Sequence, residues 1–474
     1  MFVSLPLAVS GQELEFDAVR TQAYRLALDL QPVGALERLG NENDVTSAYI
    51  ASLAEAAELL VTEDFTRFSE YEERFQQRID RNIKGSSRAY QFLQAEIRLH
   101  WAFVYLKFGH ELDAALQLRQ AYQIAMECRE KHPDYLPIQK TAGLLEIIVG
   151  SVPDKYNWVL NLLNMRGSVS AGLSDLEAVA ASSSPLSMEA RLLIELANGY
   201  VLGRPNKALE DLNLFLNKYP GNRLALFFSA GLSLKNGYNE LALQRLTELG
   251  KSSTGIPLYY ADYLRGEAYL HKGDYLNSIS AYRWFIQHQS GQNYIKDAWY
   301  KIGLCYWLNG NQNDAREVFA EAQRQGREET EADKSAARSL ASGQLPNIKL
   351  SRVRYYTDGG YYAEAEQILQ DITSIDLPER RDQIEYYYRK ARLAHLTSKP
   401  EAVAFYMETI RMTGQENWYF APNACLQLGY IYRSQNKLKE AEEFFQRALT
   451  YRRHEYKNSI DAKARLALAQ ISRM

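Results

Sequence analysis

The chain has 474 residues, of which 46% are hydrophobic and 24% are charged, a profile typical of globular proteins. The formal net charge of −3 leaves no basic excess, which argues against a nucleic-acid partner. The three cysteines are widely separated, which suits neither a disulfide framework nor a zinc site, and no apolar run is long enough to predict a membrane span.

The first residues, MFVSLPLAVSGQ, form an apolar segment that admits two interpretations. Small residues around Ala8 and Ser10 have cleavage-type spacing, so residues 1–12 can be the end of a truncated signal segment. In that case Met1 is a late start and the protein is exported or periplasmic, which is slightly favoured. Otherwise, residues 1–12 are an apolar tail that packs on the first helix of a cytoplasmic protein.

Residues 13–180 predict an irregular helical half. One amphipathic helix and a turn at Gln31–Gly34 account for the residues up to Arg38, and two helices follow over Val45–Leu60 and Thr66–Asn82. A helix pair comes next, with characteristic small and aromatic residues at Ala102, Tyr105, Ala114, Leu118 and Ala121. The apolar segment Thr141–Val179 predicts two or three mostly buried helices, because turn formers interrupt it at Gly150, Pro153, Gly167 and Gly172.

The stretch Ala181–Pro185 marks the predicted boundary to a regular array over residues 186–474. Its clearest unit places apolar and small residues on one helical face and, after a turn, on a second: Trp299, Ile302, Gly303 and Tyr306, then Ala315, Phe319 and Ala322. The turn between them is rich in asparagine and glycine. Gly303 and Ala315 are small enough to let the two helices approach closely, and the aromatic residues fill the space beside them.

The same spacing recurs along the chain. A second clear copy contains Leu428, Gly429, Tyr432, Ala441, Phe445 and Ala448, and weaker copies begin at Ala102, Ala197, Gly231, Gly266, Val353 and Ala391. The chain therefore resembles the tetratricopeptide repeat superfamily, whose unit of roughly 34 residues carries these positions. The resemblance implies an all-α fold, a right-handed α-solenoid of stacked helix-turn-helix repeats.

The N-terminal half, with its apolar segment Thr141–Val179, is also loosely similar to the eukaryotic tetratricopeptide repeat 39 and inclusion-body-clearance group. That similarity implies a shared helical scaffold and no chemistry.

Two segments depart from the repeat pattern. Residues 326–347 form a polar, charge-mixed interruption that we expect either to extend the second helix of a repeat or to act as a connector. Residues 459–474 place Ile460, Ala464, Ala467 and Ile471 on one face of a helix. Such a face fits a terminal cap, because a solenoid needs to shield the apolar surface of its last repeat.

Motifs that carry chemistry are missing from the sequence. The stretch Leu249–Ser253 contains Gly-Lys-Ser, but Arg245 stands where a phosphate-binding loop needs a glycine. The seven histidines form no metal-spaced cluster, and no nucleophile elbow occurs. We therefore expect a protein that is not an enzyme, with no catalytic residue, metal or cofactor.

The family resemblance implies where binding would occur, because the first helices of stacked repeats line a concave groove. The groove positions carried over to this chain are Tyr263, Tyr300, Lys301, Trp307, Arg354, Tyr388, Arg389, Arg392, Asn423, Gln427, Tyr430 and Arg433. This set is rich in arginine, which binds carboxylates through two parallel hydrogen bonds, and in tyrosine, which offers rigid contact area. Arg389, Arg392 and Asn423 could together hold a terminal carboxylate.

These observations predict a non-catalytic scaffold or adaptor that binds a protein or an extended, acidic peptide in its groove. The alternative is a structural repeat protein whose groove is filled by its own chain, for example by residues 326–347, or by a second copy in a homo-oligomer. A channel lined by arginine and tyrosine would favour the adaptor, whereas a filled groove would favour the structural protein.

Overall fold

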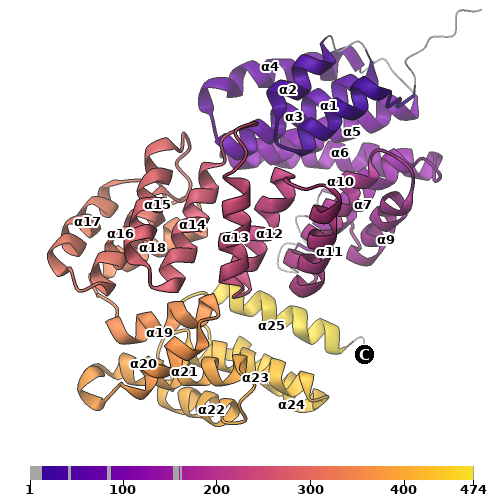
Figure 1. Cartoon of the computed structure of the whole chain (residues 1–474). Coiled ribbons are helices and arrows are strands. Elements are labelled where there is room, and N and C mark those ends of the chain that lie inside the picture. Colours follow the sequence, from indigo (N-terminus) through magenta and orange to yellow (C-terminus); the bar gives the residue numbers. More distant parts are fainter. Residues whose placement is uncertain (1–12, 41–43, 83–86, 153–159, 161–162, 473–474) are drawn as a thin grey trace, which may run out of the picture. The chain divides into compact units, whose positions relative to one another are not determined.

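The computed structural model describes residues 13–40, 44–82, 87–152, 160 and 163–472. Among these residues every regular element is a helix and no strand occurs, so the all-α prediction is confirmed. Consecutive helices lie as pairs joined by tight turns, as the repeat spacing predicts (Figure 1). Segment 1–12, for which the sequence left two interpretations, lies outside the described residues.

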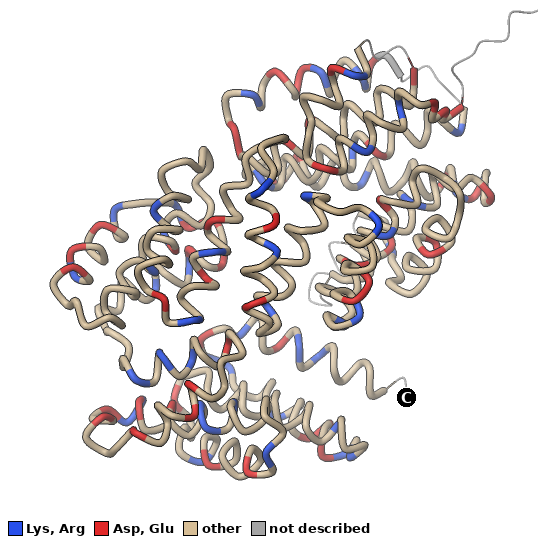
Figure 2. Tube along the Cα trace, in the orientation of Figure 1, with Lys and Arg blue, Asp and Glu red and all other residues tan. Residues whose placement is uncertain are grey.

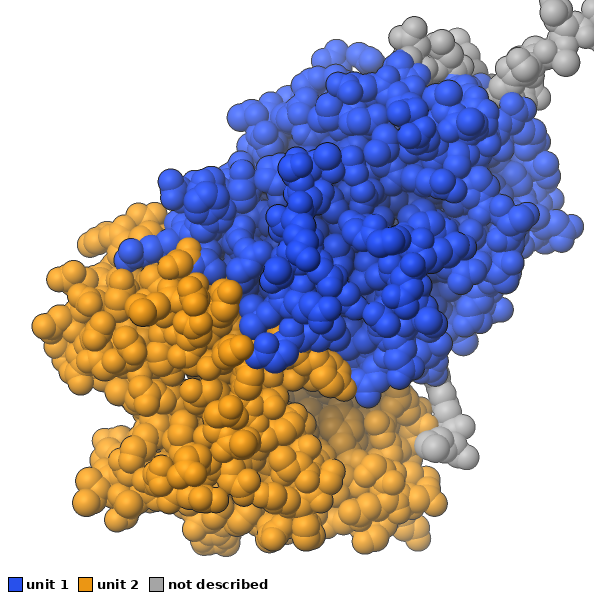
Figure 3. Space-filling model, viewed as in Figure 1, with its two compact units in different colours: residues 1–234, 240–265, 281–295 blue, residues 235–239, 266–280, 296–474 orange. Residues whose placement is uncertain are grey.

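The chain forms two compact units, which Figure 3 distinguishes by colour. Unit 1 comprises residues 1–234, 240–265 and 281–295, and unit 2 comprises residues 235–239, 266–280 and 296–474. Unit 1 is built mainly from α1 (Ala18–Leu28), α2 (Pro32–Leu39), α3 (Val45–Thr62), α4 (Phe65–Asn82), α5 (Arg88–Lys107), α6 (Glu111–Lys131), α7 (Leu136–Gly150), α9 (Val169–Ala181), α10 (Ser187–Leu196), the π-helix η2 (Ala197–Val201), α11 (Pro205–Lys218), α12 (Arg223–Lys235) and α13 (Asn239–Leu249). Helices α14 (Tyr259–Lys272) and α15 (Tyr275–His288) contribute residues to both units.

Unit 2 is built mainly from the later repeats. Its elements are α16 (Ile295–Leu308), α17 (Gln312–Arg324), α18 (Glu331–Ser342), α19 (Ile348–Gly359), α20 (Tyr362–Gln370), the short 3-10 helix η3 (Ser374–Asp376), α21 (Arg380–Leu396), α22 (Ala402–Thr413), α23 (Phe420–Ser434), α24 (Leu438–Thr450) and α25 (Lys457–Ile471). The stretch Ala181–Pro185, expected as the boundary of the array, lies inside unit 1, where α9 and α10 pack against each other. Packing therefore divides the chain at other places than the repeat pattern does.

The first predicted helix is divided in two by the structure. The helix α1 ends at Leu28, and α2 begins at Pro32, so the turn expected at Gln31–Gly34 is wrong in position. Proline suits the first position of a helix, because it has no N–H to leave unpaired and its φ angle is already helical.

The helix α3 is apolar because it is the core helix of unit 1. Among the described helices it is the one whose length and composition would allow it to cross a membrane, but 72% of that stretch is buried inside the structure. It packs against α1, α2 and α5. Burial within the protein thus accounts for its apolar sequence.

A network of charged and polar groups lies inside unit 1. The Nζ atom of Lys140 in α7 lies 2.8 Å from Glu189 in α10, 3.0 Å from Glu96 in α5 and 2.9 Å from the hydroxyl of Tyr49 in α3. Lys140 is only 1% exposed. The network therefore ties four helices together where most proteins would place apolar side chains.

Glycines let the backbones of α7 and α9 contact each other directly. A Cβ atom added to Gly172 would lie 2.3 Å from the carbonyl oxygen of Gly143, so neither position has room for a larger residue. Gly172 lies inside α9, although the sequence suggested it as punctuation between helices. Its role is close packing and not a turn.

Glycines also allow close packing of the two helices in each of the clearest repeats of unit 2. A Cβ on Gly303 in α16 would lie 2.6 Å from the ring of Phe319 in α17, and one on Gly429 in α23 would lie 2.4 Å from Phe445 in α24. The glycine and the aromatic residue form one interlocking contact in each pair. This contact is the physical reason for the spacing found in the sequence.

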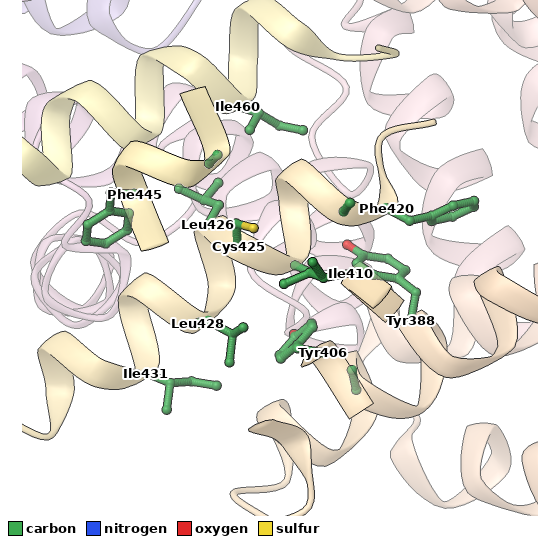
Figure 4. Packing of buried hydrophobic residues seen from close by; sticks show 14 of the residues in the cluster. Tyr388, Tyr406, Ile410, Phe420, Cys425, Leu426, Leu428, Ile431, Phe445 and Ile460 are labelled. Atoms are coloured by element: carbon green, nitrogen blue, oxygen red, sulfur yellow. The ribbon is translucent and has the colours of Figure 1, made fainter. Parts of the chain in front are cut away.

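The last repeats share a core that α25 completes. Tyr406 and Ile410 of α22, Leu426 of α23 and Phe445 of α24 belong to one buried cluster (Figure 4). The helix α25 adds three buried residues to it, Ile460, Ala464 and Ala467. The face predicted for the terminal helix is thus the face that packs.

Residues 326–347 contain a separate helix. The helix α17 ends at Arg324 and α18 begins at Glu331, so the segment does not extend the second helix of the repeat as one interpretation expected. Thr330 caps α18, and Leu340 packs into the cluster formed by α16 and α17. The buried Asp333 accepts a hydrogen bond from the Asp297 amide at the start of α16. Local capping and the burial of Ala336 and Leu340 thus stabilise a helix in this polar segment.

Candidate functional site

The candidate site lies on the first helices of the unit 2 repeats, α19, α21 and α23. We call it the inner face and define it by the groove positions that these helices carry: Arg354, Tyr388, Arg389, Arg392, Asn423, Gln427, Tyr430 and Arg433. Along the chain as a whole, basic and acidic residues are interspersed (Figure 2). The sign of any local charge therefore depends on which side chains are already paired.

Four of the predicted residues form one hydrogen-bonded chain across α21 and α23. Arg392 Nη1 donates to Gln427 Oε1 at 3.0 Å, and Gln427 Nε2 donates to Asn423 Oδ1 at 3.2 Å. Asn423 Nδ2 in turn donates to the hydroxyl of Tyr388 at 2.9 Å. The structure thus brings these four side chains together on one face, although Tyr388 itself is buried.

Arg389 is held inside the protein. It is 6% exposed, and its guanidinium donates to Glu385 at 3.0 and 2.5 Å and to the Tyr419 hydroxyl at 3.1 Å. Burial alone would lower the pKa of Arg389, but Tyr419 and Glu385 raise it overall. Because its donors are used internally, Arg389 supports the inner face and is less suited to clamp a partner than the sequence suggested.

Arg354 is the exposed cation of the inner face. Its side chain is 44% exposed, and its Nε lies 3.6 Å from Asp358, longer than a strong ion pair. Its guanidinium lies 5.6 Å from the centre of the Tyr355 ring. Burial acts to lower the pKa of Arg354, but Tyr355, Tyr456, Tyr419 and Asp358 raise it well above the usual value. We call Arg354, Tyr355 and Tyr419 the Arg354 centre, and the ring of Tyr456 packs against Tyr419.

The Arg354 centre and the neighbouring Tyr456 come from distant parts of unit 2. Tyr355 lies beside Arg354 in α19, Tyr419 precedes α23, and Tyr456 precedes α25. Tyr456 was not among the sequence candidates, because it follows a second helix and occupies no groove position.

The groove positions of α14 and α16 are covered by the chain itself. Tyr263 is buried in unit 1, where its ring stacks on Tyr260. Lys301 pairs with Glu267 and, at 3.1 Å, with Asp297.

Two further positions of α16 contact the polar segment 326–347. Trp307 Nε1 donates to the carbonyl oxygen of Pro346 at 2.8 Å, and Tyr300 hydrogen-bonds with the Ser339 side chain. Of these four predicted groove residues, Tyr263 is therefore buried, whereas Tyr300, Lys301 and Trp307 are partly exposed and have polar groups bonded within the chain.

The far end of the inner face is covered by α25. Arg433 Nη1 donates to Gln470 Oε1 at 2.6 Å, and its guanidinium lies 5.3 Å from the centre of the Tyr430 ring. The ring of Tyr430 packs on Phe445. Of the predicted groove arginines, Arg354 is thus exposed and Arg392 is partly exposed.

The cysteines do not contribute to a site. Cys128, Cys305 and Cys425 are all buried and unbridged. Burial raises the pKa of Cys305 and of Cys425 to about 12, so both are neutral core thiols. No group of histidine, cysteine and carboxylate residues suited to a metal ion occurs within the described ranges.

A hollow of about 590 Å³ in unit 1 is a weaker candidate. Arg129, Glu146 and Tyr122 are among the residues that line it. Arg129 and Glu146 pair with each other at 2.9 Å, and Arg129 also pairs with Asp175 at 2.7 Å. The charges of Arg129 and Glu146 are thus paired, while Glu130 and Arg166 also line the hollow.

The fold and this face define a protein of stacked helix pairs with a polar, aromatic inner surface. Residues 263–329 and 422–455 match family models of the tetratricopeptide repeat, so the chain contains tetratricopeptide repeats. No curated protein matches the chain. Domains of this repeat generally mediate protein binding, and the family is typically non-catalytic.

Solved structures resemble the chain at low identity. A human IFIT1 dimer with PPP-AAAA is 13% identical, with 93% of this chain and 96% of that chain covered and a TM-score of 0.39. The TPR domain of P58(IPK) is 17% identical, with coverages of 78% and 97% and a TM-score of 0.23. This likeness concerns helical architecture alone.

Proposed function

We propose that the protein is a non-catalytic scaffold or adaptor that binds another protein through an extended, acidic peptide on the inner face. The first helices of such repeats line a concave surface, and Arg354 of α19 and Arg392 of α21 would face the peptide there. Protein binding is the general role of these repeats. The proposal adds the surface that binds, the inner face, and the negative charge of the bound peptide.

The exposure of Arg354 is the observation that carries this proposal. Its guanidinium has one long contact to Asp358 and lies among tyrosines, so it keeps donors for a carboxylate. Arginine matches the planar geometry of a carboxylate, and tyrosine adds contact area with little loss of side-chain freedom. Arg392 extends the positive surface, since the side chains that it hydrogen-bonds, Gln427 and Tyr406, are neutral.

The test is capture of immobilised acidic peptides by the full chain carrying Arg354→Glu. We expect this variant to lose capture, because the reversed charge repels the peptide. Arg411→Glu is the matched control: Arg411 lies on the second helix α22, is 72% exposed and pairs with Glu408. Equal capture by wild type and Arg354→Glu would contradict the proposal, provided that both proteins melt at the same temperature.

A structural protein whose groove is filled by its own chain is the second candidate. The contacts of Trp307 with Pro346 and of Tyr300 with Ser339 favour it, because segment 326–347 covers these groove positions. A homo-oligomer partner could cover the remaining face. If the wild type captures no acidic peptide and sediments as an oligomer, this second candidate replaces the first.

A further inference from the structure

The connection Tyr451–Tyr456 between α24 and α25 rests on the edge of the inner face. Arg381 Nη2 donates to the two carboxylate oxygens of Glu455 at 2.9 and 3.2 Å. The guanidinium of Arg381 lies 5.8 Å from the centre of the Trp418 ring and 5.5 Å from that of Phe420. An arginine framed by aromatic rings thus already holds one carboxylate of the chain.

The next residue of the connection enters the Arg354 centre. The ring of Tyr456 meets the ring of Tyr419 edge-on, with centroids 5.3 Å apart and an angle of 89°. Tyr456 also helps to raise the pKa of Arg354 and the pKa of Tyr300. An acidic and an aromatic side chain, adjacent in sequence, therefore occupy the surface where a peptide would bind.

This contact is held more loosely than the helix that follows it. Tyr456 has φ = +59°, a left-handed conformation that is unfavourable for a residue with a side chain. Tyr456 is 45% exposed and the Glu455 side chain 40% exposed. The helix α25 is instead fixed by buried residues such as Ile460 and Ala464. The side chains of Glu455 and Tyr456 can therefore leave the face while α25, which begins on the Tyr456 carbonyl, stays in place.

We propose, building on the binding role proposed above, that Glu455 and Tyr456 form a removable plug over the Arg354 centre. The partner that displaces them is a peptide with an acidic residue directly followed by an aromatic one. Its carboxylate takes the place of Glu455 at Arg381, and its ring takes the place of Tyr456 against Tyr419. The chain's own plug thus identifies the chemistry that the face accepts.

Displacement makes a quantitative prediction. When a site is open only part of the time, its apparent affinity is reduced by the open fraction, so a plug in place about 90% of the time weakens binding about tenfold. The double variant Glu455→Ala with Tyr456→Ala has no plug, so its apparent affinity for the peptide should be higher than that of wild type by the same factor. Both side chains are less than half exposed, and their truncation leaves the Tyr456 carbonyl free to accept from the Ser459 and Ile460 amides at the start of α25, so we expect the variant to fold as the wild type does.

The experiment uses full-length protein and a fluorescein-labelled peptide, Gly-Ser-Glu-Tyr-Gly-Ser, titrated by fluorescence anisotropy. The double variant should bind about tenfold more tightly than wild type. Peptides with glutamine in place of glutamate, or alanine in place of tyrosine, should bind more weakly to both proteins. Glu455→Lys, which breaks the ion pair and leaves Tyr456 in place, should give an intermediate gain.

The outcomes separate this proposal from the one it rests on. Equal affinity of wild type and double variant would overturn the plug, while loss of acidic-peptide capture in Arg354→Glu would still support the binding role. Equal binding of the three peptides would overturn the acidic–aromatic partner. A peptide that binds the double variant and raises amide hydrogen exchange of residues 452–456 in wild type would support the whole proposal.

Discussion

Lys140 shows how much one buried residue can contribute. Its ammonium group is surrounded by Glu96, Glu189 and Tyr49 and is almost inaccessible to solvent. Lys140→Met would leave two carboxylates buried without their cation, which typically costs about 3–5 kcal/mol of unfolding free energy. Urea unfolding followed by circular dichroism measures this loss.

Lys131→Met is the control for that measurement. Lys131 pairs with Glu127 on the exposed side of α6, where both side chains are more than half accessible, so its removal should change stability little. Similar behaviour of the two variants would show that the Lys140 network contributes no more than a surface ion pair.

Glu96 makes the stability of unit 1 depend on pH. Burial acts to raise the pKa of Glu96, but Lys140, His100 and Thr141 outweigh it and lower the pKa from 4.5 to about 2. A carboxyl with a lowered pKa stabilises the fold above its unfolded pKa, and this contribution is lost as the pH falls from about 4.5 toward 2. Glu96→Gln should flatten that acid limb of the stability profile, whereas Glu328→Gln at an exposed position should not.

At the scale of the element, the glycine–aromatic contact decides how closely two helices pack. Gly429→Ala would place a Cβ 2.4 Å from the fully buried Phe445 ring, which should destabilise the protein by about 1–3 kcal/mol. Gly231→Ala in α12 meets its nearest atom, the Tyr200 hydroxyl, at an ordinary 3.5 Å. It should stabilise by up to about 1 kcal/mol, because alanine favours the helix. Chemical unfolding measures the free energy of unfolding of both variants. A change of the same sign in the two variants would contradict this account of the glycines.

Local spacing made the helix pairs predictable. Gly303 and Phe319, or Gly429 and Phe445, lie within one repeat, so the sequence contains both partners of each contact at a regular distance. The start of α2 and the separate helix α18 were not predictable in this way. They depend on a proline that begins a helix and on Leu340 finding an apolar surface made by other helices.

The site was predictable in part for the same reason. Arg392 of α21 and Asn423 and Gln427 of α23 occupy groove positions of two neighbouring repeats, and the structure joins them by hydrogen bonds. The burial of Arg389 depends on Tyr419, which lies outside the repeat positions. Tyr456 belongs to a connection, and only the tertiary fold places it beside Arg354.

At the scale of the whole molecule, we expect the removal of one helix to destabilise mainly the helices that pack directly against it. In stacked repeats, each helix pair contacts mainly the next, so stability is close to a sum of local terms. Unit 2 ends in α25, which contributes Ile460, Ala464 and Ala467 to the core of the last repeats. Ending the chain after Tyr456 would therefore expose the apolar surface of α23 and α24.

We expect this truncation to raise amide hydrogen exchange strongly in α23 and α24 and to leave α3, α5 and α7 of unit 1 protected as in wild type. Leu466→Glu is the control, because Leu466 lies on the exposed side of α25 and is 53% accessible. Loss of protection spread evenly over both units would mean that the chain unfolds as one cooperative body. Unchanged exchange in α23 and α24 would mean that α25 is not needed as a cap, since the last repeat would then tolerate an apolar face in water.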